Sequence, residues 1–459
     1  MTLSMAQLIN ERGTDQYDLH MQYINPPMAR VQRIIGFDKL YTRSEGAYLW
    51  DAEGNCYLDL LSGYSVFNLG RGHPAVKRVM HEMIDLDRPN LVKMDCPLLS
   101  GLLAEDLVKR MPPGLEAVFF GNSGADAVDT AIKFARAATR RPRVLYLDHA
   151  FHGLTLGTLS INGGPAFREG FEPLMSGFEM LEMNDLDALE RELRVGDVAA
   201  FILEPIQGKG VYIPDDDYLP QVQRLCQQYG TLFICDEVQV GMGRTGRFLA
   251  AEHWGLEPDM VTLAKSLSGG YIPVGAVITR RDIHSKTFSR LDRCQVHSTT
   301  FGQNEMAMAA GLAVLHVMDE EGLVERAAEM GDKLMEGLST LKGKHEMIAD
   351  VRGLGLMIAL EFSPPRSLGI RAAWTAAEKA QKGLFSQLLV MALMRDHHIL
   401  TQVGGPGVNI IKLLPPLIIG DEEIEMIVSA FDDVLTEAES VRGRVWSQSG
   451  QLIKQALSQ

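Results

Sequence analysis

Residues 232–271 read LFICDEVQVGMGRTGRFLAAEHWGLEPDMVTLAKSLSGGY, and this stretch decides the fold. It contains two short apolar runs, Leu232–Cys235 and Met260–Ala264. The first run ends in Asp236 and the second in Lys265. Apolar runs with charged residues at their carboxyl ends are typical of buried parallel strands that deliver side chains to one site. We therefore expect the acid and the lysine to lie close together on neighbouring strand ends.

The composition is that of a globular protein with two or three domains. The chain has 459 residues, 46% of them hydrophobic and 22% charged, which is too long for one ordinary core. A net charge of −15 argues against binding to the phosphate backbone of nucleic acids. The five scattered cysteines fit reduced thiols and offer no metal site. With no apolar run of about 18 residues and no signal-peptide core, we expect a cytoplasmic protein without a membrane span.

Apolar segments alternate with helical patterns through the middle of the chain. This alternation favours an α/β fold with a mainly parallel sheet and helices on both faces. Helical stretches are expected over residues 74–110, 305–341 and 372–395. The expected strands of the large sheet are Glu116–Phe120, Arg143–Leu147, Val198–Leu203, Thr231–Cys235 and Met260–Ala264.

We divide the chain into three parts. Residues 1–73 form an N-terminal segment that contributes to a small domain and to the site entrance, and a β-hairpin is predicted in it around residues 47–60. Residues 74–330 form the large domain, and residues 331–459 form the C-terminal small α+β domain. We infer no chemistry from residues 1–35. The expected strands and last helix of the small domain are Met347–Val351, Leu356–Phe362, Val408–Leu413 and Glu422–Ser440.

Asp236 and Lys265 together suggest an enzyme that uses pyridoxal phosphate (PLP), although either residue alone is a surface charge in most proteins. The lysine would hold the cofactor as a Schiff base, and the acid would keep its pyridine nitrogen protonated. Gly121–Ala125 lies between a strand and a helix, and is either a phosphate site or a plain turn capped by Ser123. Phe151, which follows another strand, either stacks on a pyridine ring or packs in the core.

With these motifs assembled, residues 40–440 resemble the class III aminotransferases. That family has the PLP fold type I, in which a mainly parallel, seven-stranded sheet forms a large domain beside a smaller α+β domain. Within the family the chain is most similar to putrescine- and ornithine-type ω-aminotransferases. The motifs that carry the resemblance are NSGAD (Asn122–Asp126), FHG (Phe151–Gly153), LEPIQG (Leu203–Gly208), DEVQVGMGRTGRF (Asp236–Phe248), PDMVTLAKSLSGGYIPVGA (Pro258–Ala276) and HSTTFGQN (His297–Asn304).

The resemblance implies a role for each matching position. Lys265 would form the Schiff base and shuttle the proton, and Asp236 would be the partner of the pyridine nitrogen. Further cofactor contacts would come from Ser123 and Gly124 to the phosphate, Phe151 and Val238 to the two ring faces, Gln239 to the phenolic oxygen, and Thr300 to the phosphate in the neighbouring subunit. The family builds its sites across a dimer interface, so a homodimer or a dimer of dimers is implied. The implied reaction is a ping-pong transfer of an amino group, by aldimine chemistry, from a primary ω-amine or amino acid to a carbonyl acceptor.

The sequence departs from the family where a substrate would bind. Ornithine-type members bind a keto-acid carboxylate through an arginine three residues before Pro-Pro-Leu, and Lys412 occupies that position here. Lysine lacks the two-pronged contact of arginine, and it could instead form an ion pair with Glu204. Lys209 stands where the family usually has an acid. The expected substrate contacts are Tyr64, Phe67, Glu204 and Lys412.

An apolar carbonyl compound is therefore the expected acceptor. We hypothesise that 2-oxoglutarate is weak or absent as an acceptor, because the arginine is replaced. The aromatic segment Tyr64–Phe67, with Leu69 beside it, would suit an alkyl chain.

Three other functions stay open. An aminotransferase of a secondary-metabolite pathway, acting on an alkyl aldehyde or ketone as in prodigiosin-type pyrrole formation, would use the same residues. An aminomutase or decarboxylase on the same scaffold would give no net transfer to an external acceptor. A catalytically silent binding protein would have no need of Lys265 and Asp236, so the presence of both argues against it.

Overall fold

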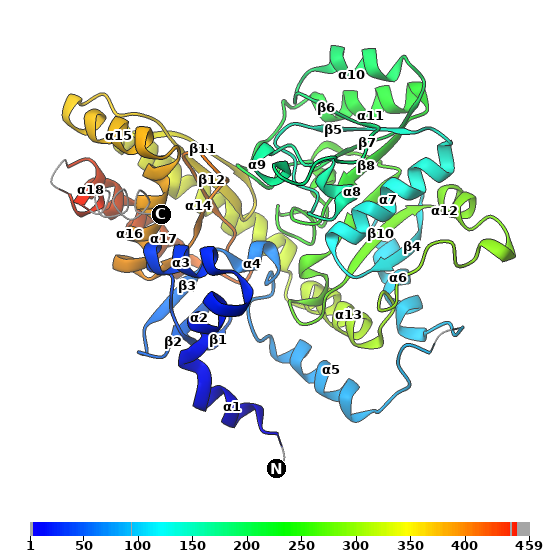
Figure 1. The fold of residues 1–459 in the computed structure, drawn as a ribbon, viewed down its shortest axis with the longest axis horizontal. Coiled ribbons are helices and arrows are strands. Elements are labelled where there is room, and N and C mark those ends of the chain that lie inside the picture. Colours follow the sequence, from blue (N-terminus) through cyan, green and yellow to red (C-terminus); the bar gives the residue numbers. More distant parts are fainter. Residues whose placement is uncertain (1–2, 93, 441–442, 448–459) are drawn as a thin grey trace.

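A computed structural model describes residues 3–92, 94–440 and 443–447 (Figure 1). Its largest sheet has seven strands in the order β4-β10-β9-β8-β7-β5-β6. The strands are β4 (Leu115–Gly121), β5 (Arg143–Leu147), β6 (Phe178–Leu181), β7 (Val198–Leu203), β8 (Leu232–Asp236), β9 (Met260–Leu263) and β10 (Gly275–Arg280). The predicted α/β fold with a seven-stranded sheet is confirmed.

The strands of this sheet run mainly in one direction. β6, β5, β7, β8 and β9 pair in parallel with their neighbours. β10 is antiparallel to both β9 and β4, so β4 runs in the same direction as β9. The carboxyl ends of all these strands except β10 therefore lie at one edge of the sheet, as the sequence predicts.

Helices cover both faces of the sheet, as the alternation of buried side chains along β7 shows. Ala200 and Ile202 pack with the apolar face of α7 (Gly124–Thr139). Phe201 and Leu203 point to the opposite face, where they join the core of α11 (Tyr218–Tyr229) and α13 (Glu305–Glu320). The other helices around this sheet are α5 (Pro74–Asp85), α6 (Leu98–Lys109), α8 (Leu156–Leu159), α9 (Pro165–Arg168), α10 (Leu186–Leu193) and α12 (Arg281–Thr287).

Two four-stranded sheets lie beside this large unit, in the orders β1-β2-β3-β13 and β11-β12-β15-β14. Their strands are β1 (Tyr41–Glu45), β2 (Tyr48–Asp51), β3 (Cys56–Asp59), β11 (Ile348–Leu354), β12 (Met357–Phe362), β13 (Ile399–Leu400), β14 (Gln402–Val403) and β15 (Ile410–Leu413). β2 and β3 form the predicted hairpin. β13 pairs in parallel with β3, so the N-terminal segment and the C-terminal region share one sheet.

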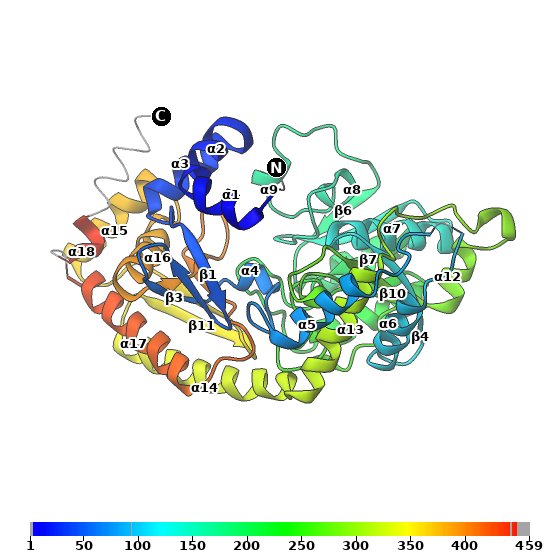
Figure 2. The same ribbon diagram turned by 90° about the horizontal axis from the view of Figure 1, so that it is seen from below.

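The helices of this smaller region surround its sheets. α14 (Leu323–Lys344) packs against β11 and α17 (Asp421–Ala438), and Figure 2 shows α13 and α14 running in turn from the large sheet toward the smaller ones. No helix in the described part of the chain is long and apolar enough to cross a membrane. The remaining helices are α1 (Met5–Arg12), α2 (Gln16–Leu19), α3 (Pro26–Ile35), α4 (Ser62–Ser65), α15 (Leu368–Ala380), α16 (Leu384–His397) and α18 (Arg444–Ser447).

The structure differs from the sequence prediction in several elements. Each of the three long helical stretches is two helices, and two of the breaks lie at Gly322 (φ 56°) and Gly383 (φ 78°). The left-handed backbone at these glycines is the reason that the second helix of each pair starts afresh. β6 and β10 were not predicted, because β6 is short and half-exposed and β10 begins at a glycine that follows Pro273 and Val274. The domain limits at residues 73 and 330 stay a prediction, and residues 1–2, 441–442 and 448–459 of the outer parts lie outside the described residues.

Candidate active site

Most of the predicted site residues converge on one cavity of about 1030 Å³ at the carboxyl edge of the large sheet. β8 ends at Asp236, and Glu204 follows β7 directly. Lys265 lies two residues after β9, and Phe151 lies four residues after β5. The predicted residues that line the cavity are Tyr64, Ser123, Gly124, Phe151, Glu204, Asp236, Val238, Gln239, Lys265 and Lys412.

The carboxylate of Asp236 is buried and held by three groups. Its Oδ2 lies 2.7 Å from Nδ1 of His152. Its Oδ1 accepts hydrogen bonds from Thr262 Oγ1 at 2.9 Å and from the amide of Val238 at 3.1 Å. Burial alone would lower the pKa of His152, but the hydrogen bond and the charge of Asp236 raise it above its ordinary value. The carboxylate therefore keeps a fixed orientation toward the cavity.

The sequence interpretation did not assign either side-chain partner of Asp236. His152 lies in the FHG motif, where only the phenylalanine received a role. Thr262 stands opposite Asp236 in the register of β8 and β9, and a strand alignment of residues 232–236 and 260–263 would have indicated it. Buried carboxylates need hydrogen-bond donors. This requirement was the available signal for both positions.

Lys265 begins a short 3-10 helix after β9. Its backbone is left-handed (φ 47°), a conformation that is uncommon for a residue other than glycine and clusters at functional sites. Burial lowers the pKa of its ammonium, against the charges of Asp236 and Glu204, which raise it. A lysine with a lowered pKa is more often a neutral amine, which is the nucleophilic form.

The N-terminus of α7 forms one wall of the cavity. Ser123 caps the helix, and its Oγ accepts a hydrogen bond from the amide of Asp126 at 3.2 Å. A Cβ on Gly124 would lie 2.7 Å from Cγ1 of Val238, so a larger residue cannot stand at this position without a shift. The partial positive charge of a helix N-terminus favours a bound anion.

Lys209 lies against two aromatic rings in the same cavity. Its Nζ is 3.4 Å from the ring centroid of Phe167 and 4.5 Å from that of Phe151. The two rings meet edge-on, with centroids 5.5 Å apart. Burial lowers the pKa of Lys209 to about 8, although the charge of Glu204 opposes this shift. The sequence interpretation noted this lysine only as a departure from the family.

Lys412 is buried and engaged in hydrogen bonds. Its Nζ donates to the carbonyl oxygen of Gly208 at 2.5 Å and to Oε1 of Gln239 at 3.1 Å. Burial, reinforced by the charge of Lys265, lowers the pKa of Lys412 to about 7. Gln239 therefore contacts this ammonium, and its Nε2 donates to the carbonyl oxygen of Tyr64 at 3.4 Å.

Glu204 does not form the direct ion pair with Lys412 that the sequence suggested. Its Oε2 accepts a hydrogen bond from the amide of Phe151 and its Oε1 one from the amide of Gly208, both at 3.0 Å. Burial raises the pKa of this carboxyl group. The acid binds the backbone around the cavity, so it fixes loops instead of neutralising the lysine by contact.

The mouth of the cavity is mostly apolar. Tyr64 lines it and is 52% exposed, but Phe67 is not among the lining residues. Phe67 lies behind Gly270, where a Cβ would collide with its ring, and the guanidinium of Arg71 covers it at 4.0 Å. Leu69 is buried in the core. Phe67 and Leu69 therefore do not line this cavity and are used in packing, and their contact with an alkyl chain stays a prediction.

Helix α3, which the sequence interpretation left without a function, forms part of this mouth. Met28, Val31 and Ile35 line it together with Leu61 and Val66. The three α3 residues recur at helical spacing on one side of the helix, and this pattern was the available signal. Without a structure nothing indicated that this face covers a cavity.

Thr300 lies outside the cavity, on an exposed segment before α13. Its neighbour Phe301 is 59% exposed. The site that one chain forms therefore lacks the threonine that the resemblance assigns to the cofactor phosphate.

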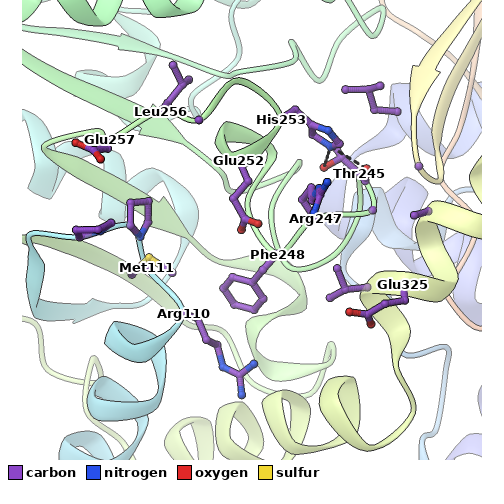
Figure 3. Close-up of a pocket in the computed structure, with 18 of the residues that line it drawn as sticks. Arg110, Met111, Thr245, Arg247, Phe248, Glu252, His253, Leu256, Glu257 and Glu325 are labelled. Carbon is purple, nitrogen blue, oxygen red and sulfur yellow. Dashed lines mark hydrogen bonds between the residues drawn. The ribbon is translucent and has the colours of Figure 1, made fainter.

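A second cavity, of about 1010 Å³, is lined mainly by residues 110–113, by residues 245–257 and by α14 (Figure 3). Arg110 and His253, two of its lining residues, serve contacts within the fold. Arg110 pairs with Asp106 and Asp319, and Nε2 of His253 lies 3.0 Å from the carbonyl oxygen of Thr245. Lys265 and Asp236 do not line this cavity, so the first cavity is the candidate active site.

Known proteins resemble the chain over almost its full length. Residues 32–435 match the model of the class-III aminotransferase family. The chain is 33% identical over 455 residues to the aminotransferase PigE of Serratia sp. (strain ATCC 39006). The matched region is 92% of this chain but only 53% of PigE, so the chain spans about half the length of that relative. It is 36% identical over 430 residues to the putrescine aminotransferase of Pectobacterium atrosepticum, across 90% of this chain and 87% of that enzyme.

A solved structure confirms the fold type. The ornithine aminotransferase of Toxoplasma gondii superposes with a TM-score of 0.82 at 28% identity, over 96% of this chain and 100% of that one. PLP partly occupies the active site of that enzyme. The chain shares its PLP fold type I, including the large, mainly parallel sheet. This chain belongs to the class III aminotransferases, a family of PLP-dependent transferases that act on small-molecule amines and carbonyl compounds.

Proposed function

We propose that this aminotransferase uses Lys265 and Asp236 as its catalytic pair and passes an amino group from a primary amine or amino acid to an apolar carbonyl compound. One observation carries the assignment of the pair. The lysine, with its lowered pKa, and the carboxylate, with its fixed orientation, line the same cavity at adjacent strand ends. This is the arrangement that PLP chemistry needs.

The residues around the cavity fit PLP. The helix N-terminus at Ser123 and Gly124 suits its phosphate, and the carboxylate of Asp236 suits its pyridine nitrogen. Phe151 and Val238 would hold the two faces of the ring, and Gln239 its phenolic oxygen. When bound, PLP supplies an electron sink for a carbanion at the substrate carbon.

The side chains of this protein would handle the proton. Nζ of Lys265 would remove the proton from the substrate carbon that carries the amino group. Its lowered pKa favours the neutral amine that can accept this proton. The carboxylate of Asp236 would lie opposite the pyridine nitrogen, and His152 and Thr262 hold its oxygens in place.

The polar contacts of Lys412 support an acceptor other than 2-oxoglutarate. The Lys412 ammonium is already bonded to Gly208 and Gln239, and it lacks the planar fork of arginine. The apolar mouth formed by Met28, Val31 and Ile35 suits an aliphatic chain. The same mouth favours the second candidate, an alkyl aldehyde or ketone acceptor in a secondary-metabolite pathway.

We further propose a homodimer, or a dimer of such dimers, in which Thr300 reaches the phosphate site of the neighbouring subunit. Exposed apolar side chains surround its segment, with Leu291 95% exposed and Met94 89% exposed. Nε2 of Gln295 donates to Sδ of Met94 at 3.3 Å, which places the two segments side by side. Exposed apolar surface of this kind marks an interface.

We place the enzyme in the cytoplasm, because its five cysteines are all unpaired.

A two-step absorbance experiment tests this function. The holoenzyme is mixed first with a panel of primary amines and amino acids, and the loss of the cofactor's aldehyde-form band is followed. After removal of the donor, 2-oxoglutarate, pyruvate and aliphatic aldehydes are added one at a time. We expect at least one donor to remove the band and an aliphatic aldehyde to restore it. A band that no donor changes, or a tight KM for 2-oxoglutarate, contradicts the proposal.

A further inference from the structure

We propose that Lys209 determines specificity by binding the single carboxylate of an amino-acid donor from its position between Phe151 and Phe167. This inference rests on the proposed aminotransferase function and names the group that recognises one of its two substrates. It places a cation beside the reacting centre at a position where the family usually has an acid.

The surroundings of Lys209 leave its hydrogen-bond donors unused. Its Nζ contacts the rings of Phe167 and Phe151 and donates no hydrogen bond to the part of the chain that the structure describes. An ammonium carries three donors, and an aromatic face satisfies its charge but none of these donors in full. A carboxylate in the cavity would offer charge-assisted hydrogen bonds, which are stronger than neutral ones.

The other cations of the cavity are committed elsewhere. Lys412 donates to Gly208 and Gln239, and Lys265 is the group that reacts. Glu204 does not neutralise Lys209 by contact, because its two oxygens accept from backbone amides. Of the lysines that line this cavity, Lys209 is therefore the one that can offer a substrate both a positive charge and unused hydrogen-bond donors.

The position of Lys209 relates it to the reacting centre. It lines the same cavity as Lys265 and Asp236, and it contacts Phe151, the residue proposed to stack on the cofactor ring. Its neighbour Gly208 is tied to Lys412 and Glu204, so the backbone at this point is anchored. Four flexible methylenes still allow the ammonium to leave the rings and reach a carboxylate.

This arrangement suits an enzyme that binds two unlike substrates in turn. A fixed, buried cation would be left unpaired whenever an apolar carbonyl compound filled the cavity, and an unpaired buried charge is costly. Lys209 instead returns to the faces of two aromatic rings, which stabilise it without a carboxylate. One cavity then accepts an amino acid in the first half-reaction and an apolar acceptor in the second.

Matched substrate pairs test the role of Lys209. Each pair is an amino acid and the amine that lacks only its carboxylate, such as alanine with ethylamine and 5-aminopentanoate with butylamine. KM and kcat of the first half-reaction are measured for the wild type, Lys209→Gln, Lys209→Arg and the control Lys379→Gln, an exposed lysine outside the cavity. For Lys209→Gln, we expect KM for the amino acid of at least one pair to rise about tenfold or more, because the contact between the ammonium and the carboxylate is lost. The ratio of KM for the amino acid to KM for its amine should therefore rise in Lys209→Gln, stay at the wild-type value in the control Lys379→Gln, and be recovered in Lys209→Arg.

A binding measurement without turnover separates this inference from the proposed function. Calorimetry of the holoenzyme with butanoate and with 1-butanol should show about tenfold weaker butanoate binding in Lys209→Gln and equal 1-butanol binding. Equal effects on both ligands, or no effect on either, overturn the role of Lys209 even where amino transfer is normal. If the wild type transfers no amino group from any donor, the aminotransferase proposal fails, and the butanoate result still decides whether Lys209 binds a carboxylate.

Discussion

Asp236 and His152 form a buried pair in which Oδ2 and Nδ1 lie 2.7 Å apart. Through this pair, the histidine acts as a positioning residue for the carboxylate that faces the cavity. His152→Ala should lower the free energy of unfolding by about 3–5 kcal/mol, because it removes one partner of a buried charged pair. The affinity for PLP should fall as well. Chemical denaturation and cofactor titration measure the two effects.

The pH dependence of the difference in unfolding free energy between the wild type and His152→Ala distinguishes a charged pair from ordinary packing. Against the effect of burial, the hydrogen bond and the charge of Asp236 raise the pKa of His152 in the folded state above its ordinary value of 6.5. The stability that the pair contributes is therefore fully present below pH 6.5 and is lost as the pH rises through the folded-state pKa. The gap in unfolding free energy between wild type and His152→Ala should narrow in that direction. A gap that is constant with pH would indicate a packing role alone.

Gly124→Ala should weaken PLP binding, because the added Cβ would lie 2.7 Å from Cγ1 of Val238. Either the N-terminus of α7 or Val238 must then move. The matched control is Gly343→Ala, also within a helix, where the added Cβ meets nothing within 4 Å. That control should keep its PLP affinity and gain about 0.8–1 kcal/mol of stability from helix propensity. Similar PLP dissociation constants for Gly124→Ala and the wild type would contradict the close approach.

Lys412→Arg should lower KM for 2-oxoglutarate, because it restores the planar fork that binds a carboxylate through two hydrogen bonds. The same change should leave KM for an aliphatic aldehyde nearly unaltered. The larger side chain fills a buried site, so a loss of stability of about 1–3 kcal/mol is expected. Steady-state kinetics with both acceptors checks this, and a tight KM for 2-oxoglutarate that is the same in wild type and variant would refute it.

Thr300 should act on the site of the neighbouring subunit. Lys265→Ala and Thr300→Val homodimers should each be impaired, the first without turnover and the second with weak PLP binding. When the two proteins are unfolded and refolded together, a mixed dimer contains one site with both native residues. We expect recovery of activity in the mixture, in proportion to the mixed dimers formed. A mixture no more active than its separately refolded components would mean that the site does not use the partner's threonine.

The sequence was sufficient to predict the edge of the sheet where the candidate site lies. Apolar strands that end in charge at Asp236 and Lys265 predicted the convergence, because parallel strands share one carboxyl edge. The partners of Asp236 could not be predicted with the same ease, since they depend on the register between β8 and β9 and on how the 148–153 loop folds back.

The substrate side was harder to predict for a physical reason. Whether an aromatic residue lines a cavity or packs behind it depends on the backbone rotation at that residue, and Phe67 turned inward against Gly270. Helix α3 contributes to the mouth only through tertiary packing. Lys209 was recognisable as a departure from the family, but its place beside two rings depends on the position of the short helix α9, which carries Phe167.

Lys265 is the residue proposed to carry the cofactor, and two other lysines could compete with it, because Lys209 and Lys412 line the same cavity and also have lowered pKa values. Borohydride reduction of the holoenzyme fixes PLP to the amine that holds it, and peptide mass spectrometry then identifies that residue. We predict that the cofactor is found on the peptide containing Lys265 and that Lys265→Ala prevents its attachment. Attachment to Lys209 or Lys412 in the wild type would contradict the account.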